Sequence, residues 1–553
     1  MTFVKRYADW LAALAALAAV LFCAARYVNF KVPPFEDAAM LMRYADHLAH
    51  GHGIVWNIGG HPVDGATDFL FMAASAALIK IGLPVGRSVR AIGFASHILT
   101  VLLVYWVNRK IWKAGIIISF VTALYLAVGT GLSYVAAFFG TPFFAFLAAL
   151  TWTFGLLLIK KENPPLWLSL LFAFAGLFTG LTRPEGVILA ALMLAAIIVV
   201  KGWRESGKTI FVFGAVFLIL GGAYFLWRWN YFGYPLPNPF YVKNGGLLHS
   251  DSLWESFSYL FRFGGPFLLA FLLGFRSKKT IRLTIAFLIP LVVFAAAFVL
   301  IDNQTNFGGR FQYALWPLVM ISWYPLVEGL EREIGFSWPA LSRVEGPQPP
   351  QVWARGVWIL AALAVAYGFV RYSASQNCLL TSAQLSCGVA YEADGRYNMA
   401  QMLSNYQGKG YVIATSEAGL LPFYSNWTAI DTWGLNDEWI AHHGGITAQY
   451  LDQYKPDVIA FHAYFSPLVP PKLIPRNLSQ EWFRMTITLM DYAQSHGYIL
   501  AASFGDSPYQ THYYYVRPDF PDSAKIVHDI STMKNYYWPG TGKKSINYAR
   551  VQP

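Results

Sequence analysis

Long uncharged apolar runs recur through the first two thirds of the chain, and they limit the fold more than any other feature. A helix needs about 17–25 apolar residues to cross the hydrocarbon core of a bilayer. Several runs reach this length, and flanking residues complete the shorter ones. We therefore expect an α-helical polytopic membrane protein with about 11 transmembrane helices, at residues 10–23, 91–107, 114–130, 143–159, 166–181, 187–200, 210–227, 263–275, 283–301, 311–327 and 357–370.

The composition agrees with this class of protein. Of the 553 residues, 56% are hydrophobic and only 13% are charged, whereas soluble proteins carry about 25% charged residues. Three cysteines exclude a disulfide scaffold and a cysteine-rich zinc module. A further apolar run, residues 69–79, is too short to cross the bilayer and is predicted to be an interfacial helix.

Basic residues between the runs predict the orientation. If the N-terminus, with Lys5 and Arg6, is cytoplasmic, every dense basic cluster falls in a cytoplasmic loop, as the positive-inside rule requires. The net charge of +11 is then a consequence of topology. We therefore expect the lipid bilayer, and no nucleic acid, as a partner of the basic surface.

Residues 372–553 are more polar, contain no predicted span and would lie outside. Apolar stretches and helical patterns alternate there, which indicates a small α/β domain. The sequence is thus divided into a transmembrane domain, 1–371, and a soluble extracytoplasmic α/β domain, 372–553. Cys378 and Cys387 would be external, as a disulfide or as free thiols. The predicted strands are 410–414, 457–461, 498–502 and 512–516, and the predicted helices include 397–406 and 446–454.

The first outside loop contains two predicted helices, near 37–50 and 68–83, and three carboxylates. Glu36 and Asp37 precede the first helix, so Asp37 could be its N-cap while Glu36 complements the helix dipole. The functional interpretation is that one of them is a general base that removes the proton of an acceptor hydroxyl. Asp64 is either a turn residue beside Gly65 or a carboxylate that supports the base.

Three cations lie in three other outside loops: Arg183, Lys243 and Arg310. They are interpreted either as side chains that reach lipid phosphates at the interface or as contacts for the phosphate of a lipid-linked substrate. Glu185 could pair with Arg183. No nucleotide-binding loop and no paired-His metal motif is present. No cofactor is certain, and the carboxylates leave open a divalent cation such as Mg²⁺, Mn²⁺ or Ca²⁺.

These loops resemble those of the polytopic glycosyltransferases of superfamily C (GT-C), and most closely the bacterial terminal β-arabinofuranosyltransferase type. The likeness extends from about residue 35 to 440. Two departures from the family pattern are Glu36, in place of an aspartate, and Asp64, in place of a glutamate. The segments that carry the resemblance are Glu36-Asp37-Ala38, 51–57, 64–70, Thr182-Arg183-Pro184-Glu185-Gly186, 235–243, Gly308-Gly309-Arg310-Phe311, 416–419 and 434–437.

The resemblance implies an inverting transfer from a polyprenyl-phosphate sugar on the extracytoplasmic face of a bacterial inner membrane. It favours arabinofuranose as the sugar and a cell-envelope glycan or protein as the acceptor. The candidate site residues are the catalytic Glu36 and Asp37, the supporting carboxylates Asp64 and Glu185, the phosphate-binding Arg183, Lys243 and Arg310, and the substrate-binding His52, Asn57, Asn238 and Tyr241.

A protein of another class is the alternative. A lipid-linked sugar flippase without transferase activity would also carry charges at the membrane interface. Transporters commonly contain inverted repeats and broken helices, and the sequence has no repeat. The acids in the first outside loop and the large polar C-terminal part favour the enzyme.

Overall fold

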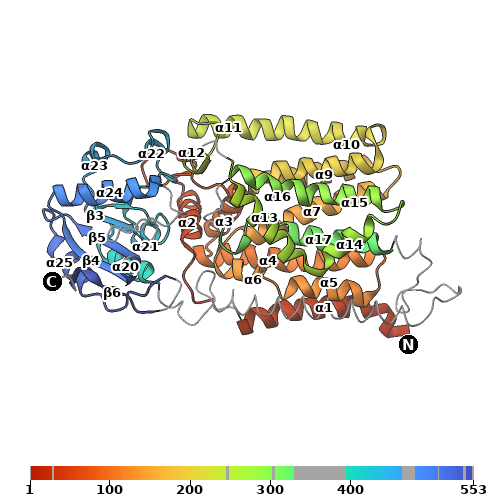
Figure 1. Ribbon diagram of the computed structural model, residues 1–553, viewed down its shortest axis with the longest axis horizontal. Coiled ribbons are helices and arrows are strands. Elements are labelled where there is room, and N and C mark those ends of the chain that lie inside the picture. Colours follow the sequence, from red (N-terminus) through yellow and green to blue (C-terminus); the bar gives the residue numbers. More distant parts are fainter. Residues whose placement is uncertain are drawn as a thin grey trace.

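The structure is a computed structural model, and it describes residues 2–27, 30–244, 248–301, 306–328, 394–463, 480–508, 510–539 and 543–550. It consists of a bundle of long, roughly aligned helices and a mixed α/β domain at one end of the bundle (Figure 1). Between them lie α2 (Glu36–Ala49), α3 (Phe69–Lys80) and α12 (Asn238–Asn244). The predicted boundary at 371/372, Cys378 and Cys387 lie outside the described residues.

Short π-helical turns at Val107–Ile111, Phe217–Gly221 and Ile289–Val293 continue α4, join α10 to α11 and join α15 to α16. The helices of the bundle are α1 (Thr2–Tyr27), α4 (Val85–Trp106), α5 (Ile116–Ala127), α6 (Gly131–Ala136), α7 (Thr141–Lys160), α8 (Leu166–Thr182), α9 (Glu185–Lys201), α10 (Trp203–Val216), α11 (Gly222–Phe232), α13 (Ser250–Gly264), α14 (Leu268–Gly274), α15 (Ile281–Leu288), α16 (Phe294–Ala297) and α17 (Leu315–Ser322).

Seven helical segments of the described chain are long and apolar enough to cross a membrane, so the chain is a multi-pass membrane protein. The expected number of eleven spans is not established. Helices α8 and α9 have 17 residues each, and within the predicted span 311–327 the helix α17 has only eight residues. The predicted span 357–370 lies outside the described residues. The seven segments are Tyr7–Arg26, Val85–Ile111, Ile116–Ala136, Thr141–Lys160, Trp203–Phe232, Ser250–Gly274 and Ile281–Leu300.

Helices α2 and α3 occupy the end of the bundle that faces the α/β domain (Figure 1). The 12 residues of α3 span about 18 Å, which is too short for a hydrocarbon core of about 30 Å. The sequence predicts one apolar face for α2, but Arg43 and His47 are buried as well as Leu41 and Tyr44. The reason is that α2 packs against α3 on one side and against the α/β domain on the other.

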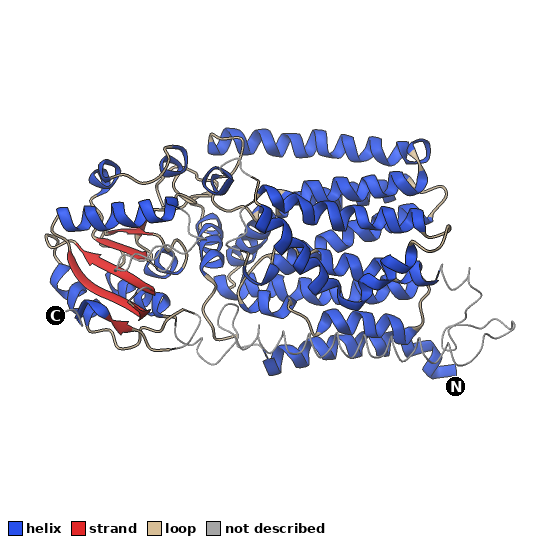
Figure 2. Ribbon diagram, in the orientation of Figure 1, coloured by secondary structure: helices blue, strands red, loops and turns tan. Residues whose placement is uncertain are grey.

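The C-terminal domain is built on a β-sheet, which is red in Figure 2. The sheet has six strands in the order β2-β1-β3-β5-β4-β6. The first three of these strands are parallel and the remaining pairs are antiparallel, so the sheet is mixed. Its elements are α20 (Gly395–Leu403), β1 (Val412–Thr415), α21 (Leu420–Ser425), β2 (Thr428–Asp431), α22 (Glu438–His442), α23 (Ala448–Tyr454), β3 (Val458–His462), α24 (Gln480–Ser495), β4 (Ile499–Ser507), β5 (Gln510–Val516), α25 (Ser523–Ser531) and β6 (Ile546–Asn547).

Both faces of this sheet are covered, as the apolar β3 shows. Successive side chains of a strand point to opposite faces. Ile459 and Phe461 pack in one cluster with residues of α23 and α24. Val458 and Ala460 belong to a second cluster, which continues through α20 and α21 into the helices of the bundle. The hydrophobic core is therefore continuous between the two parts of the molecule.

Polar contacts also hold the α/β domain on α2. The buried guanidinium of Arg43 donates to the backbone carbonyl of Trp427 over 2.9 Å and to that of Pro422. The hydroxyl of Tyr44 donates to Asn436 Oδ1 over 3.0 Å. A buried cation that donates only to neutral acceptors is costly to leave unpaired. These contacts therefore place the domain against α2 in one orientation.

Candidate active site

Asp37 and Arg310 form the centre of the site. Asp37 lies in the first turn of α2, where the helix dipole favours an anion. Arg310 Nη2 donates to Asp37 Oδ2 over 2.5 Å, although 273 positions separate the two residues in the sequence. The side chain of Arg310 is 7% exposed and that of Asp37 is 30% exposed. The side chain of Asp37 is therefore partly open to solvent, while that of its cationic partner is buried.

The backbone before Arg310 depends on two glycines. Gly308 and Gly309 have φ values of 66° and 74°, a conformation that suits glycine. A β-carbon on Gly309 would lie 2.3 Å from the ring of Tyr259, so no side chain fits there. The guanidinium of Arg310 then lies 4.4 Å from the ring centre of Phe139. The tight turn and the aromatic ring together fix the position of the Arg310 guanidinium.

Charges around Asp37 keep it ionised. Burial opposes ionisation, but Arg310 and Lys243 outweigh it and hold the pKa of Asp37 below its ordinary value. Lys243 comes from α12, a helix of seven residues. Two of the three predicted phosphate-binding cations therefore act on the same carboxylate. No described residue accepts a hydrogen bond from the buried Nε of Arg310, which leaves this donor for a ligand.

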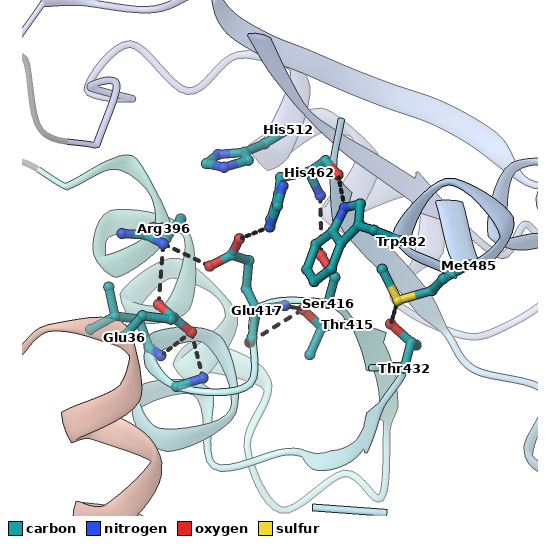
Figure 3. Close-up of polar contacts among 12 residues, drawn as sticks. Glu36, Arg396, Thr415, Ser416, Glu417, Thr432, His462, Trp482, Met485 and His512 are labelled. Carbon is teal, nitrogen blue, oxygen red and sulfur yellow. Dashed lines mark hydrogen bonds and ion pairs between the residues drawn. The ribbon is translucent and has the colours of Figure 1, made fainter. Parts of the chain in front are cut away.

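Glu36 lies in a different environment, inside a contact with the α/β domain (Figure 3). Its Oε1 accepts hydrogen bonds from the backbone N–H groups of Gly419 and Leu420, the latter over 3.0 Å. Its Oε2 lies 3.4 Å from Arg396 Nη1, and the same Nη1 is 2.6 Å from Glu417 Oε2. Glu36 thus faces Arg396 while its neighbour in the sequence faces Arg310.

One guanidinium serves three carboxylates in this cluster. Asp394, the N-cap of α20, accepts from Arg396 Nε over 3.1 Å and from Nη2 over 2.7 Å. Burial and the charge of Glu417 raise the pKa of Glu36 to about 8, against the opposite effect of Arg396. Burial also raises the pKa of Glu417. The surroundings of Glu36 therefore favour its protonated form.

Arg183 belongs to a second ion-pair group beside the first. Its Nε donates to Glu185 Oε1 over 2.6 Å, and its Nη1 lies 3.6 Å from Asp68 Oδ1. The guanidinium of Arg183 lies 5.0 Å from the ring centre of Phe311, and that of Arg310 lies 5.1 Å from the same ring centre. The two groups therefore share one aromatic ring. Asp68 was not predicted as a site residue, although it stands in one of the segments that carry the resemblance.

Asp64 has a partner that the sequence did not indicate. It forms an ion pair with Arg228 on α11, and its backbone carbonyl accepts from the N–H of Asn238 over 3.0 Å. Burial raises the pKa of Asp64 to about 6, although Arg228 acts in the opposite direction. Asp64 thus ties the first loop to α11 and to the start of α12. Its predicted role in supporting the base stays a prediction.

The four predicted substrate contacts lie in different surroundings. Asn57 is used within the protein, because its Oδ1 accepts from Ala429 N and its Nδ2 donates to Ala429 O, each over 2.9 Å. His52 is exposed. Asn238 is buried, and no described residue accepts from its Nδ2. Tyr241 packs against His442, with 4.3 Å between ring centres.

The carboxylates of the site are paired with arginines. Asp37, Asp64 and Glu36 each have a guanidinium within ion-pair distance. Among the described residues, no group of three or more His, Cys, Asp or Glu side chains could hold a metal ion. The divalent cation that the sequence left open therefore gains no ligand set from this part of the chain.

The chain was compared with protein families, with curated protein sequences and with solved structures. A family model described as a domain of unknown function, DUF8728, matches residues 384–517. No curated protein sequence matches the chain. Solved structures are similar to the chain in fold, at low sequence identity.

Two of the similar structures contain a lipid phosphate. ArnT from Cupriavidus metallidurans bound to undecaprenyl phosphate gives a TM-score of 0.54 at 14% identity, and the match covers 91% of this chain and 98% of that one. The archaeal oligosaccharyltransferase AglB from Archaeoglobus fulgidus, in complex with an inhibitory peptide and a dolichol-phosphate, gives 0.51 at 11% identity, covering 94% and 75%. At such identities the similarity concerns the fold.

Proposed function

We propose that this protein is a membrane glycosyltransferase that takes its sugar from a polyprenyl-phosphate donor, with Asp37 as the general base. The observation that carries the proposal is the pair of Asp37 and Arg310, an accessible carboxylate in contact with a buried guanidinium. A base for the acceptor and a cation for the leaving phosphate are the two groups that such a transfer needs. The pair lies at the end of the bundle that carries the α/β domain.

The choice of Asp37 over Glu36 rests on their surroundings. A general base must be unprotonated and within reach of the acceptor hydroxyl. The pKa of Asp37 is lowered by Arg310 and Lys243, and its side chain is partly exposed. The pKa of Glu36 is raised to about 8, and its Oε1 already accepts two backbone hydrogen bonds. Glu36 therefore suits the role of general base less well than Asp37 does.

The transfer is one displacement at the anomeric carbon. The acceptor hydroxyl gives its proton to Asp37 as its oxygen forms the new bond to that carbon. The bond from the anomeric carbon to the phosphate oxygen breaks on the opposite face, and its electron pair leaves with the polyprenyl phosphate. The configuration at the anomeric carbon inverts.

The cations stabilise the phosphate as its charge grows. Arg310 has a buried Nε that no described residue uses, and Lys243 acts on the same carboxylate. Preorganised donors of this kind are worth about 100- to 1,000-fold in rate. Arg183 is held by Glu185 and lies against the same ring as Arg310, so we assign it to the support of Arg310 and Phe311.

The donor class is supported by the solved structures of similar fold, one bound to undecaprenyl phosphate and one to dolichol-phosphate. We propose arabinofuranose as the first sugar to test, with a cell-envelope glycan or protein as the acceptor. We also propose that the N-terminus is cytoplasmic and that the active site and the α/β domain lie outside a bacterial inner membrane.

The test uses the full chain in lipid nanodiscs with a panel of polyprenyl-phosphate sugars, beginning with arabinofuranose, and cell-envelope acceptors. Mass spectrometry measures release of polyprenyl phosphate and the glycosylated product. We expect the wild type to consume one donor and Asp37→Asn to consume none. The control is Asp46→Asn, at a half-buried position near the end of α2, and it should consume the same donor as the wild type. Movement of labelled donor across vesicles without product would contradict the proposal and support a flippase.

A further inference from the structure

Among the described residues, the α/β domain supplies the ion-pair partner and the two hydrogen-bond donors of the Glu36 carboxylate. Arg396 comes from the first turn of α20, and the N–H groups of Gly419 and Leu420 come from the start of α21. All three residues lie within the segment 384–517 that matches the domain of unknown function. We call this set the clamp. Glu36 is the residue next to Asp37 in α2, so the clamp contacts the helix one residue from the proposed base.

The contact leaves little freedom. A β-carbon on Gly419 would lie 1.9 Å from the backbone carbonyl oxygen of Glu36, so the two backbones meet directly. The guanidinium of Arg396 is fixed before it reaches α2, because Asp394 accepts from its Nε and Nη2 and from its backbone N–H. That leaves Nη1 for Glu417 and Glu36 (Figure 3). The backbone contact at Gly419 and the contact with Arg396 together fix the position of the first turn of α2.

We propose that the α/β domain positions the general base, with Arg396 as the positioning residue, by holding Glu36 so that Asp37 faces Arg310 and the bound donor. This inference rests on the proposed function of Asp37. Arg396 itself touches no substrate in this scheme. The domain matched only as one of unknown function then has a defined part in the reaction, because the geometry of the base depends on it.

The clamp is not needed only to dock the α/β domain on the rest of the protein. The domain has separate contacts with the rest of the first loop, through Arg43, Tyr44 and Asn57. These lie further along α2 and beyond its end. Loss of Arg396 should therefore leave the domain docked and affect mainly the first turn of α2. A small misplacement of a catalytic group is enough to lower the rate by about 100-fold.

The experiment compares four changes in the full chain in nanodiscs: Arg396→Gln, Arg396→Lys, Arg396→Gln combined with Glu36→Gln, and the control Arg517→Gln. Arg517 also forms an ion pair inside the α/β domain, 2.6 Å from Asp457, but it directly follows β5 and is not part of the clamp. The measurements are kcat and KM with the polyprenyl-phosphate sugar that the wild type consumes. Hydrogen–deuterium exchange over residues 35–42 reports on the first turn of α2 without using activity.

We expect Arg396→Gln to lower kcat by about 10- to 100-fold with the KM of the donor nearly unchanged, and to raise exchange at residues 35–42. Arg396→Lys should fall between this variant and the wild type. The double variant should behave like Arg396→Gln, because the amide oxygen introduced by Glu36→Gln still accepts from Gly419 and Leu420 while the contact with Arg396 Nη1 stays lost. Arg517→Gln should keep kcat and exchange at wild-type values.

Unchanged kcat and exchange in Arg396→Gln would overturn the inference. So would an equal loss in Arg517→Gln, since the effect would then come from general weakening of the domain. A wild-type protein that consumes no donor would contradict the proposed function instead. In that case the exchange over residues 35–42 still decides whether Arg396 holds this turn.

Discussion

Glu36 and Asp37 are consecutive in the sequence, yet Glu36 faces Arg396 of the α/β domain and Asp37 faces Arg310 of the helical bundle. The surroundings thereby shift the pKa values of two carboxyls at the start of one helix in opposite directions. The pKa of Glu36 is raised to about 8, while that of Asp37 is lowered by its cations. Two titratable groups whose surroundings give them different pKa values commonly have different roles in a reaction.

The two carboxyls should therefore respond differently to removal of their charge. Asp37→Asn removes the base and should lower kcat by about 100- to 10,000-fold. Glu36→Gln resembles the protonated form, which burial favours for Glu36, so this variant should lose much less activity. Polyprenyl phosphate release measured by mass spectrometry at pH 7 gives both values. A greater loss in Glu36→Gln than in Asp37→Asn would reverse the assignment.

Arg310 should be needed for its planar guanidinium with several donors, and not only for its charge. Arg310→Lys keeps a cation but loses the planar contact with Phe139 and the second donor for a phosphate. We expect Arg310→Ala to lower kcat/KM by about 100- to 1,000-fold and Arg310→Lys to recover only part of it. Steady-state kinetics over a range of donor concentrations measure both. Arg484→Lys, an exposed change on α24, is the matched control.

The stability of the protein should fall between acid and mildly basic pH because of Glu36. Its pKa is about 8 in the folded chain against 4.5 for an unperturbed Glu. The folded state then holds a proton that the unfolded state releases, so this contribution is fully present below about pH 4.5 and is lost as the pH rises to about 8. Asp64 and Asp431, whose pKa values are raised to about 6 by burial, add losses with the same sign.

Glu36→Gln isolates the contribution of this one group. The decrease in melting temperature from pH 5 to pH 8, followed by tryptophan fluorescence, should be smaller in Glu36→Gln than in the wild type. Glu481→Gln, at the exposed start of α24, should behave like the wild type. Equal decreases in all three proteins would contradict the buried, protonated state of Glu36.

Much of the fold could be predicted because its signals are local. The apolar runs up to residue 301 all contain helices, and the C-terminal α/β domain is confirmed. Strands β1, β3, β4 and β5 begin within two residues of the predicted starts because each has an apolar run. Strand β2 was missed, since only Ala429 and Ile430 are apolar in its four residues. Strand β6 has two residues and gives no signal.

The pairings in the site could not be predicted from local pattern. The sequence singled out Asp37 and Arg310 separately, but nothing local joins residues 273 positions apart. Arg396 was not singled out at all, because an arginine near the start of an ordinary helix has no distinctive neighbours in the sequence. Arg228 was hidden at the end of a predicted span. The roles of the site residues stay predictions until the variants are measured.

Arg43 offers a test of how the α/β domain is held. Its guanidinium donates to the backbone carbonyls of Trp56 over 2.7 Å and Trp427 over 2.9 Å, and to that of Pro422. Removing the donor leaves buried carbonyls unsatisfied, at about 1–3 kcal/mol each. Arg43→Ala should therefore lower the free energy of unfolding by about 3 kcal/mol or more, and protease should cleave the domain faster.

The matched control for this change is Arg484→Ala, because Arg484 is exposed on α24 of the same domain. It should leave both the melting temperature and the rate of proteolysis near the wild-type values. If Arg43→Ala were as stable as this control, the contact between α2 and the turn from α21 to β2 would not hold the domain. In that case the continuous hydrophobic core, which joins β1 and α21 to the bundle, would have to hold the domain by itself.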